Sequence, residues 1–135
     1  MRVFLDANIL FSGSLEGSRM QALLRILFVR SRCLTNAYAV EEARRNLELK
    51  APEGLTRLEE LVGGCDIVSS SPLELQVSLK SKDLPILSGA VSGGATHLLT
   101  GDERDFGPFF GKTFRGVLVV SPKMLAEELV RLGWI

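Results

Sequence analysis

The sequence predicts an α/β protein, a three-layer α/β/α sandwich around a mostly parallel sheet of about five strands. Three observations lead to this prediction. Short apolar runs recur along the chain, helical patterns separate most of them, and Gly, Pro or a polar capping residue stands at many of the junctions. The chain shows no internal repeat and no linker, so we expect a single domain over residues 1–135.

The predicted strands are the short apolar runs at residues 2–6, 33–36, 65–70, 96–100 and 116–120. Right-handed crossovers between parallel strands would place their carboxyl ends along one edge of the sheet. Ligands of open α/β sheets bind at that edge. Polar residues that follow the strands are therefore the first candidates for a functional site.

The predicted helices cover residues 19–30, 37–50, 54–62, 73–80, 84–91 and 123–132. Ser18, Asn36 and Asp83 stand where side chains cap the first turn of a helix. Residues 7–18 carry two Gly and three Ser, and we predict a loop there. We also predict a loop over residues 101–114, which contain Gly and Pro.

Composition indicates an ordinary soluble globular protein, with 46% apolar and 24% charged residues. No apolar run approaches the ~20 residues that span a bilayer. The opening residues lack the pattern of a signal peptide, so we expect a cytoplasmic protein without a membrane partner. Cys33 and Cys65 are expected to be reduced thiols, with a disulfide as the alternative.

Charge and metal-ligand types limit the possible functions. The formal net charge is zero, so a nucleic-acid function must rest on a local site rather than on global charge. The chain has one His and no Cys pair, which makes a zinc site of the nitrogen and sulfur type very unfavourable. Any metal must therefore be held by oxygen.

Four aspartates could provide that oxygen. Asp6 and Asp102 each follow a predicted strand, and Asp83 and Asp105 lie close to Asp102 in sequence. Taken singly, Asp83 could be only a helix cap, Asp102 a turn residue and Asp105 a solvated charge. Asp6 is harder to explain this way, because a carboxylate after a buried strand is costly unless it is paired or binds something.

If these aspartates converge, each pair about 5 Å apart repels by roughly 3 kcal/mol at an effective dielectric constant near 20. The sequence fixes no Lys or Arg inside the site to offset this repulsion. A hard divalent cation, Mg²⁺ or Mn²⁺, would offset it, and both ions prefer carboxylate oxygen. Such an ion supports hydrolysis of a phosphodiester. Asn8 and Ser12 could orient Asp6 or a bound water.

The runs VFLDANILFS, AVEEARRNL and KDLPILSGAVSGGATHLLTGDERDF together resemble the PIN domain family of Mg²⁺/Mn²⁺-dependent ribonucleases. The resemblance covers nearly the whole chain and is strongest at TGDERDF with its upstream Asp83. It implies a PIN-like fold and a catalytic quartet of Asp6, Glu42, Asp83 and Asp102, with Asp105 as a further metal ligand. Asn8, Ser12 and Thr100 would support these acids.

Glu42 is the least direct of these assignments. A helical wheel places Val40, Ala43 and Leu47 on one stripe and Glu42 nearly opposite, so Glu41 or Glu42 could be a plain solvated charge. We favour Glu42 because its spacing to Leu47 matches the family. The cations close in sequence to the acids are candidates for binding the substrate backbone, namely Arg44, Arg45, Lys80, Lys82 and Arg104.

The predicted function is hydrolysis of single-stranded RNA with Mg²⁺ or Mn²⁺. Small members of the family resemble VapC-like toxins of toxin–antitoxin pairs, which implies an antitoxin partner and a homodimer; an RNA-processing nuclease is the alternative. Two rival classes remain. One is an Asp-based phosphatase or phospho-receiver domain using Asp6, and the other is a non-catalytic scaffold that binds RNA or protein.

Overall fold

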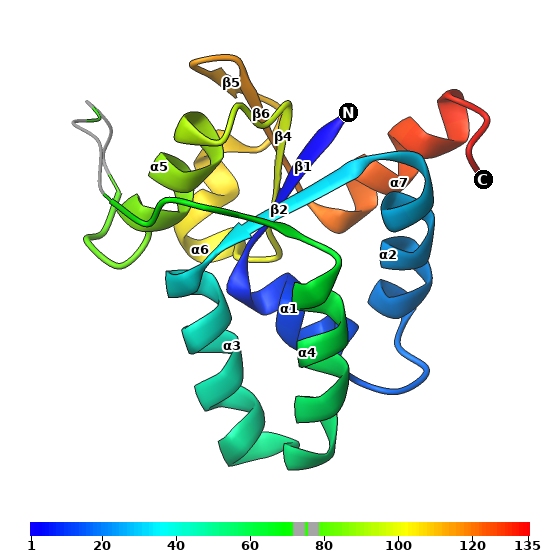
Figure 1. Ribbon diagram of the computed structural model, residues 1–135. Helices are drawn as coiled ribbons and strands as arrows, with labels where there is room; N and C mark the ends of the chain where they lie inside the picture. The colour runs from blue at the N-terminus through cyan, green and yellow to red at the C-terminus, as the bar shows by residue number, and fades with distance from the viewer. Residues whose placement is uncertain (72–74, 76–78) are drawn as a thin grey trace.

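The structure is a computed structural model, and it describes residues 1–71, 75 and 79–135 (Figure 1). The helix predicted over residues 73–80 falls mainly on residues outside this described part. In chain order the elements are β1 (Arg2–Leu5), α1 (Ala7–Gly13), α2 (Arg19–Arg30), β2 (Arg32–Asn36), α3 (Ala37–Lys50), the 3₁₀ helix η1 (Pro52–Gly54), α4 (Leu55–Gly63), β3 (Asp66–Val68), α5 (Leu84–Ser92), β4 (His97–Leu99), α6 (Glu103–Phe106), the 3₁₀ helix η2 (Gly107–Phe109), β5 (Thr113–Phe114), β6 (Val117–Val120) and α7 (Pro122–Arg131).

The strands form one sheet in the order β3-β2-β1-β4-β6-β5, parallel except for β5, which pairs antiparallel with β6. The five predicted strands are all present, and β5 adds a sixth at the edge. From β1 the chain moves outward to β2 and β3, and then returns to build β4 and β6 on the other side of β1. The order therefore reverses between β1 and β4, the position where α/β sheets of this kind open a crevice for ligands.

Helices cover both faces of the sheet, which confirms the predicted three-layer α/β/α architecture. Figure 1 shows α5 on one side of the strands and α2 and α7 on the other, with α3 and α4 side by side beyond the carboxyl ends of β1 and β2. The core is continuous between the layers: Phe4 of β1, Leu34 of β2 and Leu98 of β4 are fully buried. Burial of these central strands on both faces explains why their sequences are apolar runs without alternation.

Two loop predictions are wrong. Residues 7–18 begin with helix α1, because Asp6 caps it and its apolar residues Ile9 and Leu10 pack into the core despite the nearby Gly and Ser. Residues 101–114 contain α6, η2 and strand β5. In that segment the buried Phe106 anchors a short helix that its Gly and Pro neighbours conceal in the sequence.

The caps of α2 and α3 form as predicted. Ser18 accepts a hydrogen bond from the Gln21 N–H, and Asn36 accepts one from the Ala39 N–H. Cys33 and Cys65 are free thiols, and burial raises the pKa of each to about 12. Within the described residues, no helix has the length and apolar character needed to cross a bilayer.

Candidate metal centre

Asp6 lies directly after β1, at the point where the strand order reverses. Asp6 is only 4% exposed, and its carboxylate accepts several hydrogen bonds. Oδ1 accepts a hydrogen bond from the Ala7 N–H at 2.6 Å, which caps α1, and Oδ2 accepts from the Thr100 hydroxyl at 2.7 Å and from the Asn8 amide at 3.1 Å. The strand–helix junction therefore fixes both the position and the orientation of this acid.

The fully buried Thr100 connects the ends of β1 and β4. Its hydroxyl donates to Asp6 and accepts a hydrogen bond from the Asp102 N–H at 3.1 Å. Asn8 makes a second connection, because its Oδ1 accepts from the Gly101 N–H at 2.7 Å while its amide donates to Asp6. These contacts hold Asp6 and Asp102 in a fixed relation although they lie 96 positions apart in the sequence.

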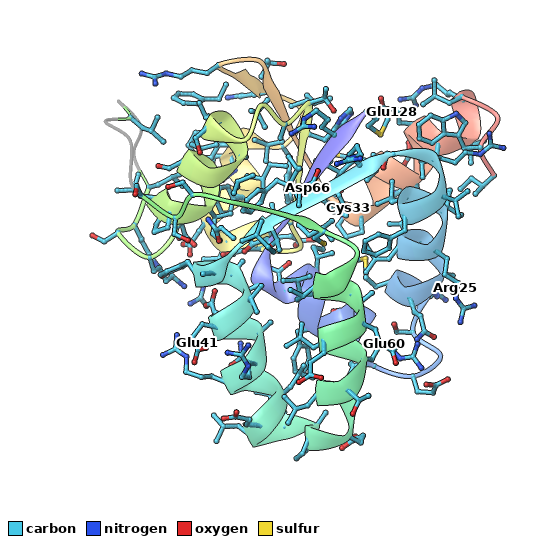
Figure 2. The ribbon with its side chains drawn as sticks, in the orientation of Figure 1. Arg25, Cys33, Glu41, Glu60, Asp66 and Glu128 are labelled. Atoms are coloured by element: carbon cyan, nitrogen blue, oxygen red, sulfur yellow. The ribbon has the colours of Figure 1, made fainter. Side chains whose placement is uncertain are left out.

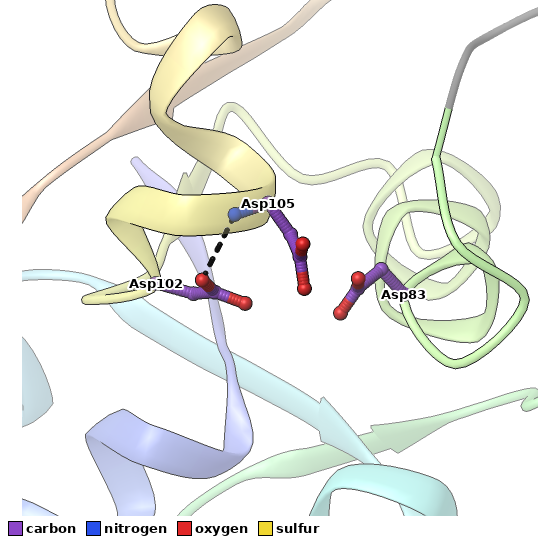
Figure 3. Close-up of side chains that lie close together, drawn as sticks. All are labelled: Asp83, Asp102 and Asp105. Carbon is purple, nitrogen blue, oxygen red and sulfur yellow. Dashed lines mark hydrogen bonds between the residues drawn. The ribbon is translucent and has the colours of Figure 1, made fainter.

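Asp102 brings Asp105 into the site by capping α6. Its Oδ1 accepts a hydrogen bond from the Asp105 N–H at 3.0 Å, shown as the dashed line in Figure 3. The first turn of α6 then directs the Asp105 carboxylate toward the same region. The Asp105 side chain is 6% exposed, so the prediction of a possible solvated charge does not describe it.

Asp83 completes a group of three acids. It occupies the position before α5, but its side chain makes no capping hydrogen bond, because its backbone is already helical at φ −96° and ψ −17°. The prediction that Asp83 caps this helix is therefore wrong. Figure 3 shows its carboxyl group directed toward Asp102 and Asp105 instead, and one oxygen from each of the three acids lies within 4.8 Å of the others.

The chemistry of this group fits a divalent cation. Asp83 Oδ2 is buried and has no hydrogen-bond partner among the described residues, which leaves a buried acceptor uncompensated. Two ionised carboxylates at 4.8 Å repel by roughly 3 kcal/mol at an effective dielectric constant near 20. All the donors are carboxylate oxygens, the ligands that Mg²⁺ and Mn²⁺ prefer.

Protons and lysines partly relieve the repulsion. Burial raises the pKa of Asp83, and the hydrogen bond and negative charge of Asp105 raise it further. Burial acts in the same direction on Asp105, but the hydrogen bond with Asp83 and the ammonium groups of Lys80 and Lys82 outweigh it and lower the pKa of Asp105. The pKa values of the two neighbouring acids are therefore shifted in opposite directions, upward for Asp83 and downward for Asp105.

Lys80 and Lys82, two of the cations predicted to lie near the acids, contact Asp105. Lys80 Nζ lies 3.2 Å from Asp105 Oδ1, and Lys82 Nζ lies 3.4 Å from Asp105 Oδ2. Both side chains are more than half exposed, so these contacts lie at the solvent-exposed rim of the site. Sequence proximity to Asp83 suggested that the lysines were near, but their partner depends on where α6 lies.

A cavity of about 200 Å³ opens at these acids. Its walls come from the start of α1, from one face of α3 and from the segments carrying Asp83 and Asp102. The lining residues are Asp6, Ala7, Asn8, Phe11, Glu42, Asn46, Lys50, Lys82, Asp83 and Asp102. Phe11, Asn46 and Lys50 were not predicted; the last two stand four and eight residues after Glu42 and therefore on the same face of α3.

Glu41 and Glu42 lie in different environments in the structure. Glu42 lines the cavity, and its negative charge contributes to the raised pKa of Asp6. Glu41 lies on the outer side of α3, where it is exposed and forms an ion pair with Arg44 (Figure 2). The helical wheel could not reveal this arrangement, because the face of α3 opposite the core stripe is not all solvent; part of it borders the cavity.

The remaining predicted residues are more scattered. Ser12 is absent from the cavity lining, and its backbone carbonyl accepts a hydrogen bond from the Ser18 hydroxyl. Arg44 is engaged with Glu41 outside the cavity. Arg45 is exposed. Burial and the negative charge of Glu42 raise the pKa of the Tyr38 hydroxyl, and the nearby positive charge of Arg45 opposes them only in part. Arg104 borders a separate hollow beside Asp105.

The raised pKa of Asp6 predicts a pH dependence of stability. Burial raises this pKa from 3.8 to about 6, against the opposing hydrogen bonds from Thr100 and Ala7. Between these values the folded state holds more protons than the unfolded chain, so the free energy of unfolding decreases as pH rises, by about 3 kcal/mol over the whole interval. Urea unfolding of chelator-treated protein from about pH 4 to 7 should show this decrease.

The matched variant for this measurement is Asp6→Asn, which cannot titrate at this position. The other acids contribute equally to both proteins, so the difference between the two pH profiles isolates Asp6. Parallel profiles across the interval would contradict the assignment of the raised pKa to this carboxyl group.

Comparison with known proteins supports the fold. At the level of sequence, no known family model and no curated protein matches the chain. Among solved structures, it is similar to a chain in the crystal structure of VapBC2 from Rickettsia felis bound to a DNA fragment from their promoter. The match has a TM-score of 0.64 and 15% sequence identity, and it covers 90% of this chain and 98% of that one. At this identity the likeness establishes a shared fold.

Proposed function

We propose that this protein is a divalent-metal-dependent endoribonuclease that hydrolyses single-stranded RNA. The observation that carries the proposal is the convergence of Asp83, Asp102 and Asp105 at the edge where the strand order reverses. One buried oxygen of Asp83 has no hydrogen-bond partner among the residues that the structure describes. The fold shared with a chain of VapBC2 and the sequence resemblance to PIN domains support the same reading.

In this proposal Asp83, Asp102 and Asp105 hold Mg²⁺ or Mn²⁺, and Asp6 lines the same cavity as Asp83 and Asp102. When bound, the ion polarises a phosphodiester oxygen and lowers the pKa of water. Glu42, which lines that cavity, can accept a proton from the attacking water. Thr100 and Asn8 keep Asp6 oriented, so the carboxylates need no rearrangement during the reaction.

The two rival classes make different predictions. A phosphatase or phospho-receiver needs Asp6 as a nucleophile or phosphate acceptor, yet each of its oxygens already accepts a hydrogen bond inside the fold. Covalent phosphate on Asp6 would favour that class. A scaffold needs no metal at all, and its RNA or protein binding would be unchanged by Asp6→Asn.

The proposal is tested by incubating the purified, folded protein with labelled single-stranded RNA and Mn²⁺ or Mg²⁺. We expect cleavage with either ion and none with an excess of chelator. Cleavage should return when the metal is restored, which separates metal dependence from damage to the protein. The proposal would be contradicted if a preparation free of any inhibitory partner left the RNA intact under all these conditions.

An antitoxin partner and a homodimer remain predictions from the family resemblance. A peptide partner that covers the cavity would reduce cleavage when it is co-expressed.

A further inference from the structure

The cavity extends beyond the acids along one face of α3. Glu42, Asn46 and Lys50 follow one another at intervals of four residues and all line it. At a rise of 1.5 Å per residue, Asn46 lies about 6 Å and Lys50 about 12 Å along the helix axis from Glu42. The wall of the cavity thus changes from acidic at one end to an amide and then to a cation at the other.

An aromatic side chain stands opposite the cationic end. Phe11 of α1 lines the same cavity and is only partly buried, and the Lys50 ammonium lies 6.0 Å from the centroid of its ring. At an exposed site such a contact is weak, so the lysine can leave the ring for a stronger partner. The pair offers a flat apolar face and a mobile positive charge side by side.

We propose that Phe11 and Lys50 form a nucleotide subsite beside the acids, in which a base of single-stranded RNA stacks on Phe11 and Lys50 binds a flanking phosphate. The assignment deepens the proposed function and rests on it for the identity of the polymer. Unstacked bases pair with aromatic rings in single strands, and a lysine neutralises phosphate as a point charge. Asn46, between the two ends, can hydrogen-bond a sugar or a base edge.

This subsite replaces part of the predicted set of substrate cations. Arg44 is paired with Glu41 outside the cavity, and Lys82 lies beside Asp105. Lys50, by contrast, has no ion-pair partner among the described residues; its described contact is the one with Phe11. Its charge is therefore free to meet a phosphate without breaking an existing salt bridge.

The test measures RNA binding separately from cleavage. A short mixed-sequence, fluorescein-labelled single-stranded RNA is titrated with protein carrying Asp102→Asn, a change expected to slow cleavage by at least about 100-fold. Lys50→Gln and Phe11→Leu are added to this parent one at a time. Phe11→Leu keeps apolar bulk against the core, and Lys112→Gln removes an equal charge from an exposed position outside the cavity. Thermal unfolding confirms that each variant is folded.

We expect distinct signatures from the two variants. Loss of Lys50 should reduce the slope of log affinity against log salt concentration by about 0.7, as for one phosphate contact in a single strand. Loss of the Phe11 ring should weaken binding by about 5- to 100-fold with the salt slope unchanged. Lys112→Gln should leave both quantities close to those of the parent.

The outcomes separate this inference from the proposed function. If the wild-type protein cleaves RNA and the Lys50 and Phe11 variants bind like the parent, the subsite is wrong and the nuclease proposal stands. If the wild-type protein does not cleave but both variants lose affinity as described, the subsite stands and the nuclease proposal fails. A parent that binds no single-stranded RNA overturns the subsite.

Discussion

Asp102→Asn is expected to slow RNA cleavage by at least about 100-fold at saturating Mn²⁺, while without metal the variant is expected to be at least as stable as the wild type. A 100-fold loss corresponds to about 3 kcal/mol of transition-state stabilisation, a modest share of what metal-centred charge stabilisation supplies. The asparagine keeps Oδ1, which accepts from the Asp105 N–H and caps α6. It replaces the other carboxylate oxygen with an amide group that cannot bind a cation.

The separation of activity from stability makes this variant informative. Asp and Asn are nearly equivalent as helix caps, so the metal-free variant should be no less stable than the wild type, whereas Asp102→Ala would also lose the cap at a cost of about 1 kcal/mol. Asp66→Asn is the matched control. Asp66 begins strand β3 and forms an exposed ion pair with Arg32, so this variant makes the same chemical change outside the site. Cleavage by Asp102→Asn at the wild-type rate would exclude this residue from the reaction.

Asp83→Asn is expected to reverse the order of stability between wild type and variant when metal is added. Without metal at pH 8, the variant should be more stable by about 1–3 kcal/mol, because it removes a charge from a buried group whose Oδ2 has no hydrogen-bond partner in the described part of the chain. The new amide can also donate a hydrogen bond to Asp105, which the ionised carboxylate cannot do.

With Mn²⁺ at about 100 times its dissociation constant, the wild type should gain about 2.7 kcal/mol of stability and the variant little or none. Chemical unfolding with chelator and with Mn²⁺ measures both halves of the prediction. Lys82→Gln provides a control that changes charge at the rim without removing a carboxylate ligand. If Asp83→Asn destabilises the metal-free protein, the carboxylate is satisfied in the fold and the case for a cation there weakens.

The sequence predicted the layer architecture well because central parallel strands are short, apolar and separated by amphipathic helices. It failed where tertiary contacts decide the local structure. Helix α1 forms because Asp6 caps it and Ile9 and Leu10 reach the core, although the segment reads as a loop. Strand β5 is two residues long and exists through its pairing with β6.

The acids themselves could be found from their places after strands, but their contacts could not. Nothing in the sequence indicates that Asp83 turns away from the helix it precedes or that Lys80 and Lys82 meet Asp105. These relations depend on how α5 and α6 approach each other across the sheet edge. The opposite wall of the cavity, from Phe11 to Lys50, depends in the same way on the packing of α1 against α3.

The capping of α6 by Asp102 has a consequence for heat inactivation. One carboxylate oxygen holds the first turn of a helix only four residues long, and that turn in turn positions Asp105. Short helices with few internal hydrogen bonds open locally at a lower free-energy cost than a buried sheet. Fraying of this single turn would separate Asp105 from the other proposed metal ligands while the strands remain folded. Activity should therefore be lost at a lower temperature than the one at which the whole protein unfolds.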